Sequence, residues 1–125
     1  MNNWAEGVHP FVPTVSKYLL GVPDSVVEVF KSKLTHSTTN VKAAEKLLAS
    51  LDTMRAGGEV YEVDVLAVGF ALVVFDMAMS VGNLRDAAND VINSWEQGDL
   101  AGAVRDLHDA EAEAGATMDR VYGNA

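Results

Sequence analysis

The sequence contains no cysteine, and this absence excludes three kinds of chemistry at once. The chain forms no disulfide framework, no thiolate metal site and no cysteine nucleophile. A chain without cysteine suits a reducing compartment. No basic cluster precedes an apolar run in the first twenty residues. We therefore expect no secretory signal, and we favour a cytoplasmic protein or one within a particle assembled in the cytoplasm.

Several catalytic and ligand-binding patterns are also missing. The chain has no glycine-rich phosphate loop, no serine elbow and no tetrahedral set of zinc ligands. Glu6 and His9 have the E-x-x-H spacing of an iron motif, but a di-iron site needs two such motifs and further carboxylates. His108 and Glu111 could share a metal on one helix, although the surrounding acids favour simple solvation. We predict no catalytic, cofactor-binding or metal-binding residue, and a protein that is not an enzyme.

Lysine is absent from the second half of the chain. Residues 1–57 hold six basic and five acidic side chains, a net charge of +1, whereas residues 58–125 hold three arginines and thirteen acids, a net charge of −10. Affinity for nucleic acid comes mostly from Lys and Arg, so direct binding to nucleic acid is disfavoured. The charge division could orient contacts within the fold or between copies. It also fits an acidic, solvated surface.

The apolar content is sufficient for one folded domain. With 125 residues, of which 49% are hydrophobic, the chain is long enough to bury a core. We predict a single helical domain over residues 1–125, of which residues 1–12 form an irregular N-terminal arm. Trp4 and Phe11 are predicted to pin this arm to the body or to a neighbouring chain.

A seven-residue repeat of apolar side chains runs through residues 60–95. Its two interleaved series are Val60, Ala67, Val74, Val81, Ala88 and Trp95, and Val63, Phe70, Met77, Leu84 and Val91. This repeat predicts a long central helix with an apolar seam that other segments cover. Residues 59–66 also alternate as a strand does. The unbroken repeat favours helix from about residue 63 onward.

The same stretch allows two other interpretations. Eleven apolar residues precede Asp76, and extension to Val81 gives seventeen residues around a carboxylate, whereas a bilayer needs about twenty. We therefore expect no membrane span. A buried Asp64 or Asp76 could act as a general acid or base, but we favour a position at an edge or a pair with a basic residue of the first half. Gly69 and Gly82 each lower the stability of the helix relative to alanine. We therefore expect another helix to approach closely at both positions, where a larger side chain would not fit.

Shorter helices are predicted on both sides of the central one. Residues 14–20 and 41–55 have helical periodicity, and Ser25 and Glu28 form an S-x-x-E capping box for a helix between them. Gly98 and Asp99 predict a short connection to a last helix that begins at Leu100 and runs antiparallel to the central one. The fold class is all-α, a helical bundle built round a long central helix at about 60–95, with an antiparallel C-terminal helix and three shorter N-terminal helices.

We expect a non-enzymatic assembly or interaction protein. The long seam and the charge division favour a homo-oligomer, or a structural subunit that docks into a larger multi-protein particle such as a virion or a secretion complex. The alternative is a small acidic regulator that occupies a basic, nucleic-acid-binding surface of a partner protein. The predicted interaction residues are Leu84, Ala88, Val91 and Trp95 on the seam, Asp106, Asp109, Glu111 and Glu113 on the last helix, and Trp4 and Phe11 in the arm.

Overall fold

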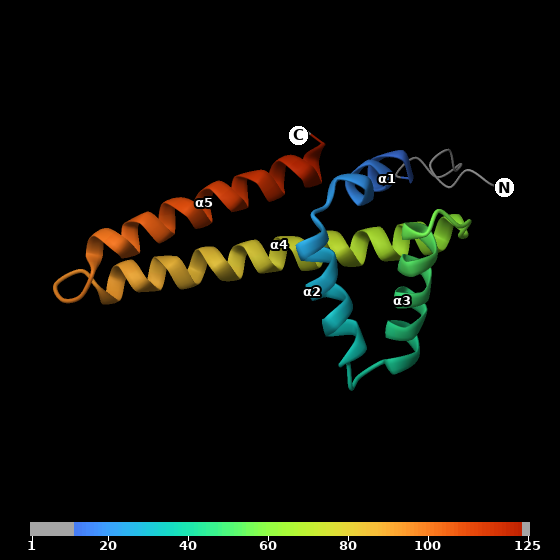
Figure 1. Ribbon diagram of the computed structural model, residues 1–125, viewed down its shortest axis with the longest axis horizontal. Coiled ribbons are helices and arrows are strands. Elements are labelled where there is room, and N and C mark those ends of the chain that lie inside the picture. Colours follow the sequence, from blue (N-terminus) through green and yellow to red (C-terminus); the bar gives the residue numbers. More distant parts are fainter. Residues whose placement is uncertain (1–11, 124–125) are drawn as a thin grey trace. The chain divides into compact units, whose positions relative to one another are not determined.

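The computed structural model describes residues 12–123, which form five helices and no strand (Figure 1). The helices are α1 (Val12–Gly21), α2 (Asp24–Thr35), α3 (Val41–Arg55), α4 (Glu62–Asn93) and α5 (Leu100–Tyr122). The predicted all-α bundle is confirmed, with α4 as the long central helix, α5 packed against it and three shorter helices before it. The chain divides into two compact units, one ending at Val73 and one beginning at Val74, and α4 passes from the first into the second.

The predicted N-terminal arm falls almost entirely outside the described residues. Trp4 and Phe11 lie outside them, so their predicted role stays a prediction. Val12, predicted to be the last residue of the arm, is instead the first residue of α1 and is fully buried.

The first unit holds most of the apolar core. Within this unit, the Tyr18 hydroxyl of α1 donates to the Leu72 carbonyl oxygen of α4 at 3.4 Å. An ion pair of 3.0 Å joins Lys31 of α2 to Asp52 of α3. The fully buried side chains come from all four helices of the unit and include Val12, Val27, Leu51, Val65, Val68 and Leu72.

Side-chain caps were predicted for the N-termini of two helices, and one of the two is confirmed. The Asp99 carboxylate accepts a hydrogen bond from the Gly102 N–H at 2.9 Å, so the predicted cap of α5 is confirmed. The predicted capping box of α2 is wrong, because the N-cap is Pro23 and no side chain caps the helix. The helix begins at Asp24, whose carboxylate is favourable beside the helix N-terminus, and Ser25 is therefore inside the first turn.

The beginning of α4 settles the choice between strand and helix. Residues 59–61 are not helical, and α4 begins at Glu62, close to the predicted start. The helical interpretation of residues 59–66 is therefore confirmed from Glu62 onward.

The two glycines of α4 differ in their surroundings. A Cβ atom on Gly69 would collide with the Val15 side chain of α1, so the predicted close approach is confirmed there. A Cβ atom on Gly82 would meet no atom within 4 Å among the described residues, so the same prediction is wrong at Gly82.

Candidate functional site

The second unit is an antiparallel hairpin of α5 and the part of α4 that begins at Val74. The two helices pack along a row of residues on each helix, which we call the seam. The seam consists of buried or half-buried positions that recur every three or four residues on both helices. They are Met77, Ser80, Leu84, Ala87 and Val91 on α4, and Leu100, Ala103, Leu107, Ala110, Ala114, Thr117 and Val121 on α5.

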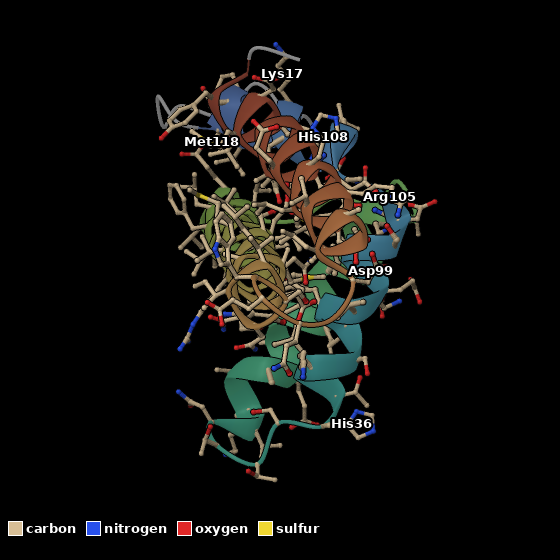
Figure 2. The ribbon with its side chains drawn as sticks, turned by 90° about the vertical axis from the view of Figure 1, so that its left-hand side faces the viewer. Lys17, His36, Asp99, Arg105, His108 and Met118 are labelled. Carbon is tan, nitrogen blue, oxygen red and sulfur yellow. The ribbon has the colours of Figure 1, made fainter. Side chains whose placement is uncertain are left out.

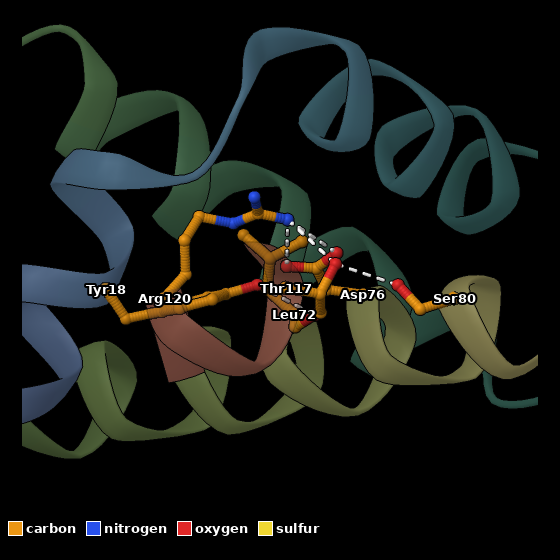
Figure 3. A network of polar contacts seen from close by, with 6 residues as sticks. All are labelled: Tyr18, Leu72, Asp76, Ser80, Thr117 and Arg120. Carbon is orange, nitrogen blue, oxygen red and sulfur yellow. Dashed lines mark hydrogen bonds and ion pairs between the residues drawn. The ribbon is translucent and has the colours of Figure 1, made fainter. Parts of the chain in front are cut away.

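A polar network lies inside this hairpin (Figure 3). Nη2 of Arg120 donates to the two carboxylate oxygens of Asp76, at 3.2 and 3.1 Å, and to Thr117 Oγ1 at 3.1 Å. The Ser80 hydroxyl donates to the same Thr117 oxygen at 2.8 Å. Asp76 is only 1% exposed, so its charge requires a partner inside the protein. The network fixes which residues of α4 and α5 lie level with each other.

The two carboxylates that interrupt the apolar stretch have different partners. Oδ1 of Asp64 lies 3.6 Å from Nζ of Lys46, which is a basic residue of the first half, as predicted. Asp76 is paired with a basic residue of the second half. Its partner is Arg120, because α5 runs back along α4 and places the guanidinium beside it.

Most residues of the first predicted heptad series are exposed in this unit, and Ala88 is half-buried. Val74, Val81 and Trp95 are 67%, 65% and 68% exposed, whereas Leu84 and Val91 of the other series are half-buried. The prediction that other segments of the chain cover this apolar repeat is therefore wrong at Val74 and Val81. Helix α5 packs against the side of α4 that carries the polar network. The contact between the two helices therefore follows Met77, Ser80 and Leu84, and it leaves Val74 and Val81 exposed.

One stripe of mostly exposed residues on α4 and one on α5 lie on the same side of the hairpin. Each residue of these stripes comes directly after a seam residue or, for Val74, after the half-buried Val73. Successive residues of an α-helix are about 100° apart around the helix axis, so each stripe lies about 100° from the seam. Two antiparallel helices viewed from one end turn in opposite senses, so these stripes meet on one side. We call this surface the association face; its residues are Val74, Ala78, Val81, Arg85, Ala88 and Ile92 on α4, and Val104, His108, Glu111, Gly115, Met118 and Tyr122 on α5.

The association face is largely apolar, and all but two of its residues are exposed. Ile92 is 69% exposed and Tyr122 is 64% exposed, so large apolar side chains lie at both ends of the hairpin. Figure 2 shows Met118 and Arg105 projecting to opposite sides of α5. An exposed group of large apolar side chains is typical of a contact with another molecule.

The predicted interaction residues are divided between several surfaces. Ala88 and Glu111 belong to the association face, Leu84 and Val91 belong to the seam, and Trp95 lies in the turn after α4. The remaining predicted residues of α5 are exposed elsewhere on that helix: Asp106, Asp109 and Glu113.

Sequence reasoning missed most of the association face. Ile92 of α4 and Val104, Met118 and Tyr122 of α5 were not predicted to be interaction residues, although each follows a seam residue. The apolar residues that directly follow the seam positions of both helices are a sequence signal that could have identified the face.

A second apolar feature lies in the first unit. A groove of about 400 Å³ between α3 and α4 is lined by apolar side chains beside the Lys46–Asp64 ion pair. Its apolar lining is Ala43, Leu47, Val63 and Ala67.

The histidines of the described chain are not grouped with other metal ligands. Within residues 12–123, no three His, Asp or Glu side chains lie close enough together to hold a metal ion. His36 is exposed at the end of α2, with Nδ1 2.8 Å from the Ser32 carbonyl oxygen. His108 and Glu111 are both exposed on α5. Glu6 and His9 lie outside the described residues.

By length and composition, α4 could cross a membrane. The most apolar 18-residue window of this helix is only 28% buried in the structure. Much of its apolar surface is therefore available to another molecule.

Comparisons with models of known protein families, with curated proteins and with solved structures gave no match. The association face is therefore interpreted from its own residues. Its exposed valines, isoleucine, methionine and tyrosine are suited to burial against another apolar surface.

Proposed function

We propose that the protein is a non-catalytic assembly subunit that associates with protein through the association face. The exposure of Val74 and Val81 on a helix as apolar as α4 is the observation that supports the proposal. These side chains repeat with heptad spacing, the pattern by which helices pack together. A second protein surface would cover the side of α4 that α5 leaves exposed.

The size of the face is adequate for such a contact. Full burial of a fully exposed Val, Ile or Met side chain contributes roughly 1.5–3 kcal/mol, and the large apolar side chains of the face are 49–69% exposed. Association costs an estimated 4–15 kcal/mol in lost freedom of motion. The five strongly apolar residues Val74, Val81, Ile92, Val104 and Met118 offset a cost in that range when both partners supply such residues.

A protein partner is favoured over a lipid bilayer by the side chains around α4. Asp76 lies within the apolar stretch and is held by Arg120 of α5, so α5 accompanies this part of α4. Asp119 of α5 is exposed and, by the Asp76–Arg120 register, level with Met77, so its charge would then enter the hydrocarbon region. Charged groups at the bilayer centre cost several kcal/mol each.

Sedimentation of the full chain at micromolar concentration tests this proposal. We expect wild-type protein to form an assembly, and Val81→Asp to dissociate it, because the substitution places a charge in the apolar face. Asn83→Asp is the matched control, since it adds the same charge to an exposed residue of α4 outside the face. Circular dichroism checks that both variants keep their helix content.

Two results would contradict the proposal. One is a monomeric wild-type protein with no partner in a pull-down. The other is flotation with neutral phospholipid vesicles that Val81→Asp abolishes, which would identify the face as a membrane surface.

A separate variant tests the acidic-regulator alternative. Asp106, Asp109 and Glu113 are exposed on α5 and lie outside the association face. Their replacement by Asn and Gln leaves assembly unchanged under our proposal. The alternative instead requires loss of binding to a basic partner, together with steep salt dependence.

A further inference from the structure

We infer that the partner at the association face is a second copy of this chain, placed by a two-fold axis parallel to the hairpin so that Arg85 of each copy meets Glu111 of the other. This inference rests on the proposed function and specifies its partner. The relevant observation is that the face contains two opposite charges, one on each helix, at the same level.

The polar network establishes this level. Arg120 of α5 is paired with Asp76 of α4. Arg85 lies nine residues after Asp76, and Glu111 lies nine residues before Arg120. Because both helices rise by the same distance per residue and run in opposite directions, Arg85 and Glu111 are level along the hairpin. The Ser80–Thr117 hydrogen bond gives the same register to within one residue.

The two charges do not neutralise each other within one chain. Arg85 and Glu111 are both exposed, and none of the ion pairs among residues 12–123 involves either of them. Each charge therefore has hydrogen-bonding capacity for a group on another molecule.

Symmetry decides which arrangement uses both charges. A two-fold axis parallel to the hairpin places α4 of one copy opposite α5 of the other and preserves the level of every residue. Arg85 then faces Glu111 of the other copy, and the pair occurs twice because such an interface is self-complementary. An axis across the hairpin would instead place each helix opposite its own copy and would leave these pairs unmade.

Small side chains make room for the second copy. Ala78 and Ala88 alternate with the larger residues on α4. On α5, Gly115 lies between Glu111 and Met118, and a Cβ atom there would meet no atom within 4 Å among the described residues. The face therefore has both projections and depressions, as helices that pack closely require.

A charge exchange between chains tests the arrangement. The dimer dissociation constants of Arg85→Glu, Glu111→Arg and the double variant are measured by sedimentation of full chains. Each single variant places like charges opposite each other at two symmetric positions, and we expect dimerisation to weaken about tenfold. The double variant restores both pairs with reversed polarity and should return to within about threefold of wild type.

An equimolar mixture of the two single variants is the decisive measurement. In the mixed dimer, the two substituted positions carry opposite charges and face each other across the interface. The native Arg85 of the Glu111→Arg chain likewise faces the native Glu111 of the Arg85→Glu chain. We expect the mixed dimer to form with wild-type affinity although neither variant dimerises well alone. Recovery in the mixture excludes pairing within one chain, since mixing could not repair an internal ion pair.

The failures of the two proposals are distinguishable. Single variants that dimerise as well as wild type, or a mixture that does not recover, would overturn the arrangement. If Val81→Asp still abolished association in that case, the association face would remain the contact and its occupant would be a different protein. A monomeric wild-type chain would overturn both proposals.

Discussion

The Arg120 guanidinium holds the buried Asp76 carboxylate through one nitrogen, Nη2, which lies 3.2 and 3.1 Å from its two oxygens. The side chains are 17% and 2% exposed, so each charge depends on the other inside the hairpin. We predict that Asp76→Asn lowers the free energy of unfolding by about 3–5 kcal/mol, because it leaves Arg120 buried without its counter-charge. Urea unfolding followed by circular dichroism measures the change.

Two further variants distinguish the contribution of the ion pair to the free energy of unfolding from the effects of helix propensity and net charge. Asp86→Asn removes the same charge from an exposed position of α4 and should change stability by less than about 0.5 kcal/mol. Asp76→Leu combined with Arg120→Met replaces both charges and should cost much less than Asp76→Asn alone. Equal stability of Asp76→Asn and Asp86→Asn would show that the pair contributes little.

The two glycines of α4 give a matched pair of opposite predictions. Gly69→Ala forces a methyl group against Val15, and we expect a net loss of about 1–3 kcal/mol in spite of better helix propensity. Gly82→Ala enters open space and should gain up to about 1 kcal/mol. Thermal unfolding of the two variants checks both signs. A gain at Gly69 would mean that α1 yields to the added methyl group.

The helices themselves could be predicted from the sequence, because their signals are local. Apolar periodicity gave the predicted bounds of the third helix at 41–55, and Asp99 capped α5 as its position indicated. The rotational position of α4 could not be predicted in this way. Between Val65 and Phe75 this helix is apolar on every side, so it offers no unique seam and the heptad pattern fits several faces equally well.

A tertiary pairing decided that position. Asp76 and Arg120 are 44 residues apart, and Ser80 and Thr117 are 37 apart, so no local pattern joins them. Once these pairs form, α5 lies over Ser80 and Ala87, and Val74 and Val81 turn outward. The candidate site was therefore predicted only in part: Ala88 and Glu111 are on the association face, whereas the valines were expected to be covered.

The buried hydroxyl of Ser16 tests how much a polar group without a hydrogen-bond partner lowers the stability of the fold. Ser16 of α1 is 3% exposed, and its Oγ finds no hydrogen-bond partner among the described residues. We predict that Ser16→Ala raises the free energy of unfolding by about 1 kcal/mol, because an unsatisfied buried hydroxyl costs stability. Chemical denaturation measures this gain. Ser25→Ala, at an exposed position of α2, is the control and should not stabilise the protein. A loss of stability in Ser16→Ala would contradict the prediction and would indicate that a water molecule satisfies the hydroxyl.

The ion pair between α2 and α3 predicts a loss of stability in alkali. The Asp52 carboxylate accepts a hydrogen bond from Lys31 and attracts its charge, which raises the pKa of Lys31 above its usual 10.5. The folded state therefore holds this proton more tightly than the unfolded state. The contribution of the pair is fully present below pH 10.5 and is lost as the pH rises through the higher pKa of the folded protein. Stability curves of wild type and Lys31→Gln should thus converge between about pH 10 and pH 12, whereas Lys33→Gln, an exposed neighbour on α2, should run parallel to wild type. A difference between wild type and Lys31→Gln that stays constant over this range would show that the pair does not stabilise the contact between α2 and α3.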